Sequence, residues 1–332
     1  MRKIFIGLAG FTVIASGVLA AVSYAYHGIG AAAMDADLPV AMTVQASQLP
    51  LDQTFKQSTG GHRVRFEGGW TLSSGHDGFG GFSGLVIDDE NKTLLAISDK
   101  GDWWQTPFDV QRFSPPTAGI MRGYAKDTAA DKKDLDAESL IKFDGGYLVS
   151  FEQNHRLELV TEVGEGGVPA PLAKIDFSGV SMNSGMEAIA RLKDGKLLAF
   201  SERGRNRKGQ LKAWLVSAVS VQDLWYKPPA NFAPTDAATL PNGDVLVLLR
   251  YFSAIEGVAI KVHRIKAGDI AAGAELTGEE VLHLTPEFSV DNMEGMDAVV
   301  LDDNTVRLVM ISDDNFNLVQ RTLLMMFDYD YR

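Results

Sequence analysis

Short runs of apolar residues recur along the chain in pairs, and the residues between the two runs are typical of turns. In the clearest pair the apolar-rich runs are Met186–Leu192 and Leu197–Phe200, and an Asp-Gly turn signal lies between them. Runs of this length around such a turn predict a β-hairpin. An acidic residue stands at the outer end of each run, Glu187 and Glu202. Because a hairpin brings its outer ends together, we expect both carboxylates on the same side.

The same hairpin pattern occurs five times. The other copies begin at residues 82, 136, 235 and 292, and aligned positions lie 49 to 58 residues apart. About fifty residues hold four strands of ordinary length with their turns. Further strand-like runs follow most hairpins, such as Val258–Ile265 and Glu280–Leu284. The repeat therefore predicts an all-β fold, a single β-propeller of four-stranded blades.

Five copies favour five blades over residues 63–332. A sixth blade would have to come from Asp102–Asp134, whose composition is that of an elaborated loop. Six blades are the alternative, and an unrelated β-sandwich is another. The last copy is followed by one clear run, Leu323–Tyr329, whereas Arg63–Leu72 has no hairpin partner of its own. We expect this N-terminal strand to complete the last sheet and close the ring.

Residues 1–25 are typical of a secretory signal peptide. Arg2 and Lys3 precede the apolar run Ile4–Val22, and Ser23–Ala25 offers small residues for cleavage. The alternative is an uncleaved anchor, because the apolar run approaches the length of a membrane span. Residues 26–62 have little periodicity and predict a linker or N-terminal arm. We expect a periplasmic or secreted protein.

Charge and composition exclude several classes of function. The chain has 43 acidic against 31 basic residues, a formal net charge of −12, which argues against nucleic-acid binding. It has no cysteine, which excludes disulfides, cysteine-ligated zinc and thiol catalysis. It also lacks the GxSxG and HExxH motifs. We expect a monomer that acts on a small molecule and meets a membrane only through an uncleaved signal segment.

Acidic residues recur at aligned positions of the five hairpins. The first strand of each propeller blade lines the central channel, so residues at its start would meet those of the other blades. The aligned residues at the start of the first strand are Ser83, Glu138, Glu187, Asp236 and Glu294. Those at the end of the second strand are Asp99, Glu152, Glu202, Arg250 and Asp313. By the hairpin geometry both sets face one mouth of the channel, where eight carboxylates would repel one another.

Two arrangements would relieve this repulsion. One is a set of salt bridges to Arg203, Arg250 or Arg156. The other is a divalent cation, above all calcium, which prefers oxygen ligands. The predicted metal ligands are Asp99, Glu138, Glu152, Glu187, Glu202, Asp236, Glu294 and Asp313, with neutral oxygens nearby on Asn183, Asn292, Asn315 and Asn317. Alternatively, the acidic residues cap turns and pair across blades, above all in the second-strand set.

Candidate catalytic residues lie among the same positions. Glu187 and Glu294 are the strongest, because each has an asparagine and a glycine within a few residues, where a ligand could approach the backbone. His155, close to Glu152, is the candidate general base, and His76 is a more distant one. Two aromatic pairs would either wall a pocket or pack in the core: Trp103-Trp104 and Tyr251-Phe252.

Five stretches taken in order resemble a known family: FSGLVIDDENKTLLAISDKG, DAESLI, NSGMEAIARLKDGKLLAFSERG, DNMEGMDAVV and ISDDN. Over roughly residues 65–329 the chain is similar to the phytase-like propellers of exported bacterial proteins, described by an esterase-like activity of phytase. The resemblance implies hydrolysis of an ester or phosphoester. Calcium-dependent propeller phytases are similar in their acidic channel, but they have six blades and clustered Lys and Arg. Few basic residues stand at the mouth here, which argues against phytate as the substrate.

The leading hypothesis is a metal-dependent hydrolase. The four acidic residues of the first-strand set would hold the cation, which would polarise an ester or phosphoester oxygen and activate water, while Arg203 or Arg250 steadies an anionic group. A lactonase is a close variant. The alternative from another class is a non-catalytic propeller that binds a ligand or partner and uses the cation structurally.

Overall fold

The computed structural model describes residues 39–50, 56–59, 62–124, 134–177 and 185–332. They belong to the unit that spans Asp37–Arg332. The predicted signal peptide, residues 1–25, and Asn183 lie outside the described residues. Within the described residues no helix is long and apolar enough to cross a membrane.

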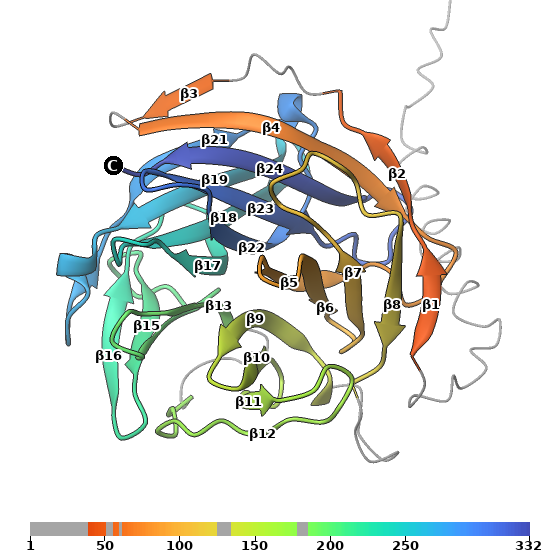
Figure 1. Cartoon of the computed structure of the whole chain (residues 1–332). Coiled ribbons are helices and arrows are strands. Elements are labelled where there is room, and N and C mark those ends of the chain that lie inside the picture. The colour runs from red at the N-terminus through yellow and green to blue at the C-terminus, as the bar shows by residue number, and fades with distance from the viewer. Residues whose placement is uncertain (1–38, 51–55, 60–61, 125–133, 178–184) are drawn as a thin grey trace, which may run out of the picture. The chain divides into compact units, whose positions relative to one another are not determined.

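The chain forms five β-sheets, and the first strand of each predicted hairpin is the strand of its sheet nearest the centre (Figure 1). The first sheet contains β5 (Phe82–Asp88), β6 (Thr93–Ser98), β7 (Trp103–Pro107) and β8 (Ala118–Arg122), with β1 (Val40–Thr43) at its edge. The second contains β9 (Ala137–Phe143), β10 (Gly146–Phe151), β11 (Arg156–Val160) and β12 (Val168–Pro169). The third contains β13 (Met186–Arg191), β14 (Leu197–Ser201), β15 (Leu211–Val216) and β16 (Val221–Tyr226), with β20 (Glu275–Leu276) parallel to β16.

The fourth sheet contains β17 (Ala233–Thr239), β18 (Val245–Ser253), β19 (Gly257–Ile265) and β21 (Glu279–Leu284). The fifth contains β22 (Met293–Val300), β23 (Thr305–Ser312), β24 (Thr322–Asp330), β4 (His62–Ser73) and β2 (Gln45–Gln48), and β3 (Lys56–Thr59) pairs with β4. Two short 3-10 helices are η2 (Ala267–Asp269) and η3 (Pro286–Phe288). The chain is thus an all-β, five-bladed propeller with four-stranded blades, as the hairpin repeat predicted.

The inner strands β5, β9, β13, β17 and β22 surround the centre (Figure 1), and each contacts the next in this order, with β22 contacting β5. The segment considered for a sixth blade supplies β7 and β8, the outer strands of the first sheet. Five blades therefore account for the described chain, and a two-layer sandwich does not.

The hydrophobic core is divided among the interfaces between neighbouring sheets. Trp104 packs with β23 and β24 residues between the fifth and first sheets. Trp103 packs with Phe151 between the first and second sheets, and Trp214 packs with Phe143 between the second and third. The two remaining clusters lie between the third and fourth sheets and between the fourth and fifth. The adjacent tryptophans of β7 therefore pack in two different cores and do not wall a pocket.

The turn of the third hairpin shows why the local sequence folds as it does. The Gly195 amide donates to the Leu192 carbonyl (2.9 Å), and the Leu192 amide donates to the Lys196 carbonyl (2.8 Å). Gly195 has a φ of 81°, which glycine adopts at little cost, and a Cβ there would meet no atom within 4 Å. Backbone conformation, and not lack of space, therefore requires the glycine in the predicted Asp-Gly turn.

The N-terminal part of the described chain lies against the first and fifth sheets. The predicted strand Arg63–Leu72 lies within β4, which pairs antiparallel with β24. Residues assigned to an arm before this strand also form strands: β1 pairs with β8 of the first sheet, and β2 pairs with β4 of the fifth. The stretch Val40–Gln48 therefore adds an outer strand to each of two sheets.

Candidate functional site

Every inner strand carries a β-bulge near its start, at the same place in each hairpin. The register of each inner strand against its partner skips one residue there. A bulge leaves the extra residue unpaired and re-aims its side chain, and bulges are frequent next to active sites. The five skipped residues are Ser83, Glu138, Glu187, Thr235 and Glu294.

The bulge register corrects one predicted site residue. Thr235, not Asp236, is the bulge residue of the fourth blade, so Asp236 aligns with Ser139 of the second. The prediction for this copy aligned its acid, Asp236, with the acids of the other copies, but the bulge lies one residue earlier.

The carboxylate of Asp236 forms hydrogen bonds with two other blades, one residue after the bulge of its own strand. Its Oδ2 accepts a hydrogen bond from the Met296 amide of the fifth blade (2.7 Å), and its Oδ1 accepts one from the Ala237 amide (2.8 Å). Ser139 of the second blade also donates its hydroxyl to Oδ1 (3.3 Å). Burial raises the pKa of Asp236 well above its ordinary value, while the amides of Met296 and Ala237 oppose that rise. Both oxygens are engaged, which is the arrangement of a structural residue.

The acidic residues predicted at the ends of the second strands lie at the open end of each hairpin, opposite its turn. Asp99, Glu152 and Asp313 each follow the last residue of a second strand directly. Their amides donate to carbonyls across the hairpin: Asp99 to Gly81 (2.8 Å), Glu152 to Asp136 (2.8 Å) and Asp313 to Asn292 (2.9 Å). Glu202 follows β14 in the same way, whereas Arg250 of the fourth blade lies within the longer β18 and pairs with Ala233. The hairpin geometry thus gathers these side chains at one end of the inner strands.

The two acidic sets meet in one cavity of about 330 Å³, which we call the acidic cavity. It brings together seven of the eight predicted metal ligands; Asp236 is the exception. Eight carboxylates and two guanidinium groups line it. The lining residues are Ser83, Asp99, Asp136, Glu138, Glu152, Gln153, Glu187, Glu202, Arg203, Arg250, Glu294, Asp313 and Asn315.

The arginine contacts are concentrated on one side of the acidic cavity. Arg250 donates through Nη2 to Glu202 Oε1 (3.2 Å), and its Nη1 lies 3.7 Å from Glu294 Oε1. Arg203 pairs with the other oxygen of Glu202 (2.5 Å). Arg250 also donates to Asn292 Oδ1 (2.5 Å), which occupies that predicted neutral ligand. Burial lowers the pKa of Arg250, but the surrounding carboxylates raise it overall.

On the second-blade side, three carboxylates lie together. Oxygens of Asp136, Glu138 and Glu152, one from each, all lie within 4.8 Å of one another. Gln153 donates to Asp136 Oδ2 (2.5 Å), and the Gly185 amide donates to Glu152 Oε1 (3.1 Å). Oxygens at these separations can ligate one hard cation at the bond lengths usual for calcium, 2.3–2.6 Å.

Arg156, one of the predicted counter-charges, is used elsewhere. Its Nε donates to Glu158 Oε1 (2.5 Å), and its guanidinium lies 3.8 Å from the centre of the Phe151 ring. It does not line the acidic cavity. The salt bridges of the cavity therefore involve Glu202 and Glu294, while the charge of Arg203 also opposes the rise in the pKa of Glu152 on the second blade.

The crowding of buried carboxyl groups in the acidic cavity raises their pKa values. Burial, reinforced by neighbouring carboxylates, raises the pKa of Glu138 and of Glu187 well above the ordinary value. Burial raises the pKa of Glu294 to about 6, although Arg250 opposes the shift. Burial and then the charge of Glu294 raise the pKa of Asp313 to about 8. The cavity thus holds protons near neutral pH unless another positive charge enters it.

The structure does not bring either candidate histidine to the acidic cavity. The ring of His155 packs against Phe177 (4.8 Å between centroids) and lines a separate apolar cavity beside Met186. His76 Nδ1 accepts a hydrogen bond from the Gly78 amide (3.1 Å) in its own loop. Glu152 and Gln153 line the acidic cavity but His155 lines the separate one, so closeness to Glu152 in sequence did not place His155 at the mouth.

Asp136 and Gln153 are site residues that sequence reasoning missed. Asp136 was recognised as the start of the second hairpin but not as a ligand. A signal was present, because Asp136 faces Glu152 across the open end of that hairpin and stands two residues before Glu138. No comparable signal pointed to Gln153, which has a φ of 52° in the turn after β10.

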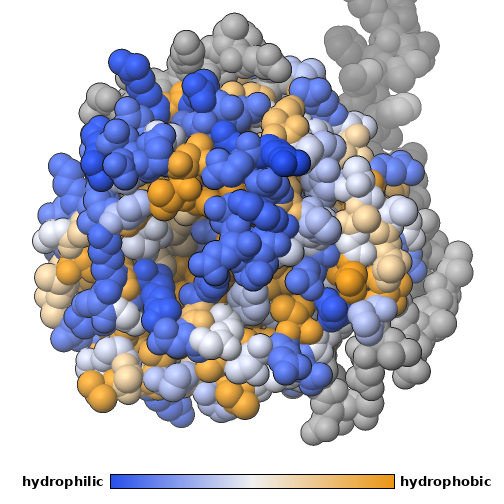
Figure 2. All heavy atoms as spheres, in the orientation of Figure 1, coloured by the Kyte–Doolittle hydropathy of each residue, from blue (hydrophilic) through white to orange (hydrophobic). Residues whose placement is uncertain are grey.

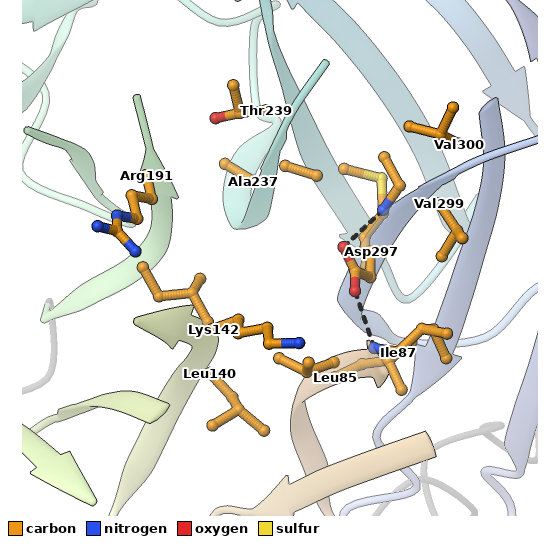
Figure 3. A pocket seen from close by; sticks show the side chains of 15 residues that line it. Leu85, Ile87, Leu140, Lys142, Arg191, Ala237, Thr239, Asp297, Val299 and Val300 are labelled. Atoms are coloured by element: carbon orange, nitrogen blue, oxygen red, sulfur yellow. Dashed lines mark hydrogen bonds between the residues drawn. The ribbon is translucent and has the colours of Figure 1, made fainter. Parts of the chain in front are cut away.

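The other end of the inner strands opens into a second cavity of about 330 Å³, which we call the opposite cavity (Figure 3). Most of the side chains that line it are apolar. The polar ones are Lys142, Arg191, Thr239 and Asp297. The oxygens of Asp297 accept hydrogen bonds from the Ile87 amide (2.8 Å) and the Ala298 amide (2.7 Å). Figure 2 shows mixed hydrophilic and hydrophobic residues over the face seen in the orientation of Figure 1.

A family model described as Phytase-like, esterase-like activity of phytase, matches residues 77–316. The comparison with curated proteins gives no match. Solved structures similar to this chain include an endo-arabinase from Bacteroides thetaiotaomicron VPI-5482, at a TM-score of 0.48 and 9% identity over 74% of this chain and 92% of that one. A calcium-binding protein, regucalcin, from Agrobacterium tumefaciens C58 has a TM-score of 0.40 and 10% identity over 76% and 91% of the two chains. Identities of this size say nothing about what this chain binds or does.

Proposed function

The chain belongs to the phytase-like family, and on that premise we propose that it is a hydrolase that cleaves an ester or phosphoester at the acidic cavity with the help of a divalent cation. Calcium is the leading candidate for the ion. One observation carries the proposal: eight carboxylates from four blades line one cavity, and several of them are held in an environment that disfavours their charge. A bound cation would reverse that cost.

Asp136, Glu138 and Glu152 would hold the cation. Their oxygens are close enough to share one ion, whereas the arginines of the cavity form their ion pairs with Glu202 and Glu294. Gln153 and Asn315 could add neutral oxygens, since both line the same cavity. When bound, such an ion supplies a Lewis acid for the substrate oxygen and lowers the pKa of a coordinated water.

The protein's own residues would orient the substrate and carry protons. Arg250 and Arg203 line the same cavity as the proposed cation ligands, where their charges would hold an anionic group of the substrate. Glu294, with a pKa of about 6, exchanges protons near neutral pH and is the better general acid or base. Glu187 is the second candidate, because burial keeps its proton on over a wider range of pH.

Elemental analysis and substrate assays test the proposal together. Purified protein should hold a divalent cation, and its melting temperature should rise in calcium relative to chelator. A panel of phosphomonoesters, carboxylesters and lactones should reveal turnover that Glu138→Gln and Glu152→Gln remove. Glu165→Gln, an exposed acid outside the cavity, is the matched control. Full turnover in chelator, or in both cavity variants, would contradict the proposed site.

A second candidate function is a propeller that binds the cation for stability and has no turnover. The observation that favours it is that the cavity carboxylates come from different blades, so one ion would neutralise charges that otherwise push the blades apart. The same experiments separate the two functions. A calcium-dependent rise in melting temperature without turnover on any ester of the panel would support the binding function.

The environment of the protein follows from the same reasoning. We propose that residues 1–25 direct export, so that the site works in the periplasm or outside the cell, where free calcium is abundant enough to fill it. The substrate is proposed to be a small molecule and the protein a monomer. Fractionation of cells that express the full chain, with N-terminal sequencing of the product, tests export and cleavage. Light scattering tests the oligomeric state.

A further inference from the structure

A larger cavity of about 780 Å³ lies directly beside the acidic cavity. Its walls come from β18 and β19, from residues 286–292 and from the loop 313–321 between β23 and β24. We call it the outer cleft. Arg250 and Asn315 line both the outer cleft and the acidic cavity, so the two spaces share a wall. A ligand held at Arg250 would therefore extend from one into the other.

Apolar side chains are exposed at the outer cleft to an unusual degree. Phe252 is 67% exposed and Val319 is 84% exposed, and both line the cleft. Ile255, in the turn between β18 and β19, and Leu318, in the loop between β23 and β24, are each 95% exposed. These four are half of the eight large apolar side chains exposed in the described part of the chain. Phe252 and Val319, exposed on the same cleft, therefore mark a surface that meets an apolar partner.

The charged groups of the outer cleft are already paired. Arg321 contacts Asp291 through Nε (3.4 Å) and donates through Nη2 to the Ser289 carbonyl (3.1 Å). Arg250 is held by Glu202 and Asn292 at the boundary with the acidic cavity. Both arginines of the cleft are therefore already paired, and Phe252 and Val319 offer exposed apolar surface to hydrocarbon among its polar residues.

We propose that the outer cleft binds the acyl or alkyl chain of the substrate, whose ester or phosphoester group lies beside Arg250. This inference rests on the proposed function, because it names the class of substrate for the same site. It predicts a preference for esters with chains of several carbons over short polar ones. Continuity with the acidic cavity is what favours a substrate chain over a membrane or a second copy of the protein.

The first test is the dependence of turnover on chain length. With p-nitrophenyl esters from acetate to octanoate in calcium, we expect kcat/KM to rise about 2-fold per added methylene, half of what full burial of a methylene provides. The double variant Phe252→Ser/Val319→Ser should flatten this rise; both side chains are exposed, so the fold should tolerate the change. Val219→Ser is the matched control, because Val219 is 90% exposed and lies in the turn between β15 and β16.

A binding measurement keeps this inference separate from the proposed function. By calorimetry, n-octylphosphonate should bind about 100-fold more tightly than methylphosphonate, and the double variant should lose that difference. A preference for the octyl compound without turnover on any ester would refute the hydrolase and support the cleft. Turnover that is independent of chain length, with equal binding of both phosphonates, would overturn the cleft and leave the hydrolase standing.

The same variants also test two alternative partners of the exposed apolar side chains, a lipid membrane and a second copy of the chain. Binding to phosphatidylglycerol vesicles that the double variant abolishes, with the chain-length preference unchanged, would make the apolar rim a lipid-binding surface and overturn the proposal. Concentration-dependent self-association that the double variant abolishes would overturn it in favour of a contact between copies of the chain.

Discussion

Glu294 and Asp297 lie on the same strand, β22, but at opposite ends of the channel. Glu294 is a bulge residue whose oxygens face Arg250 and the Asn292 side chain among other carboxylates. Asp297 stands in regular register opposite Val309, and backbone amides of Ile87 and Ala298 occupy its oxygens. The bulge is what separates the two, because it turns a side chain toward the mouth that regular pleating would direct elsewhere.

The same contrast holds for the two cavities as wholes. The acidic cavity gathers carboxylates that repel one another, whereas most side chains that line the opposite cavity are apolar and backbone amides donate to both oxygens of its one acid, Asp297. Unfavourable charge that persists in a folded protein is a mark of function more than of stability. Chemistry is therefore expected at the acidic cavity, and the opposite cavity is expected to contribute packing.

The largest expected effect is on the pH dependence of stability without a cation. A carboxyl group whose pKa is higher in the folded protein than in the unfolded chain stabilises the fold fully below the unfolded value, near 4, and loses this contribution as pH rises through the folded value. The folded pKa values are about 6 for Glu294 and about 8 for Asp313. The free energy of unfolding of the metal-free protein should thus fall by about 6 kcal/mol between pH 4.5 and pH 8, about 4 from Asp313 and about 2 from Glu294. Urea unfolding in chelator measures this.

Two variants test whether that pH dependence of stability comes from the acidic cavity or from the opposite cavity. Asp313→Asn should remove much of it, because that group has the higher pKa of the two. Asp297→Asn should leave the larger part in place, although burial also raises the pKa of Asp297. The assignment would be wrong if the second variant flattened the profile more than the first, or if metal-free stability rose with pH.

The next effect concerns Asp236, which joins blades between the two cavities. Asp236→Ala leaves the buried amides of Ala237 and Met296 without their acceptor, and each such loss costs about 1–3 kcal/mol. We expect the free energy of unfolding to fall by about 3 kcal/mol, both in calcium and in chelator. Asp236→Asn, which keeps one acceptor oxygen, should lose less. A loss confined to the calcium-loaded protein would instead make Asp236 a ligand, as the sequence first suggested.

A smaller effect of opposite sign is expected for Glu138→Gln. Removing one charge from the crowded acids should raise the free energy of unfolding by about 1 kcal/mol in chelator. The same change should reduce the rise in melting temperature that calcium produces, because one ligand is lost. Thermal melts with and without calcium measure both. Destabilisation in chelator would mean that Glu138 is held by favourable contacts and not by repulsion.

The sequence predicted more of the fold than of the site. Paired apolar runs around short polar turns, three of them with Asp-Gly or Asn-Gly, were enough to find five hairpins, because hydrophobic pattern and turn chemistry are local properties. Glu187 and Glu294 could be placed at the mouth because their strands and partners were aligned correctly. The fourth blade was misaligned by one residue, since a bulge at Thr235 or at Asp236 gives the same pattern of apolar positions.

Other features depend on three-dimensional paths that no local pattern records. The sequence did not show that the chain turns His155 into a different cavity after β10. It also did not show that residues around β1 and β2 pair with two sheets, because short edge strands such as Gln45–Gln48 have little apolar periodicity. Such pairings are decided by tertiary contact, where β-propensity is weakest as a guide.

The smallest expected effect is at the opposite cavity, at Lys142. Its side chain is mostly exposed and its Nζ lies 3.7 Å from Asp88 Oδ1, a surface pair of the kind that contributes at most about 0.5 kcal/mol. Lys142→Met should therefore change the melting temperature little, and it should leave both the calcium response and ester turnover as in the unaltered protein. Because Lys142 stands at the same channel as the acids, a strong loss of either response would mean that the two ends communicate, and the division between a chemical end and a packing end would have to be given up.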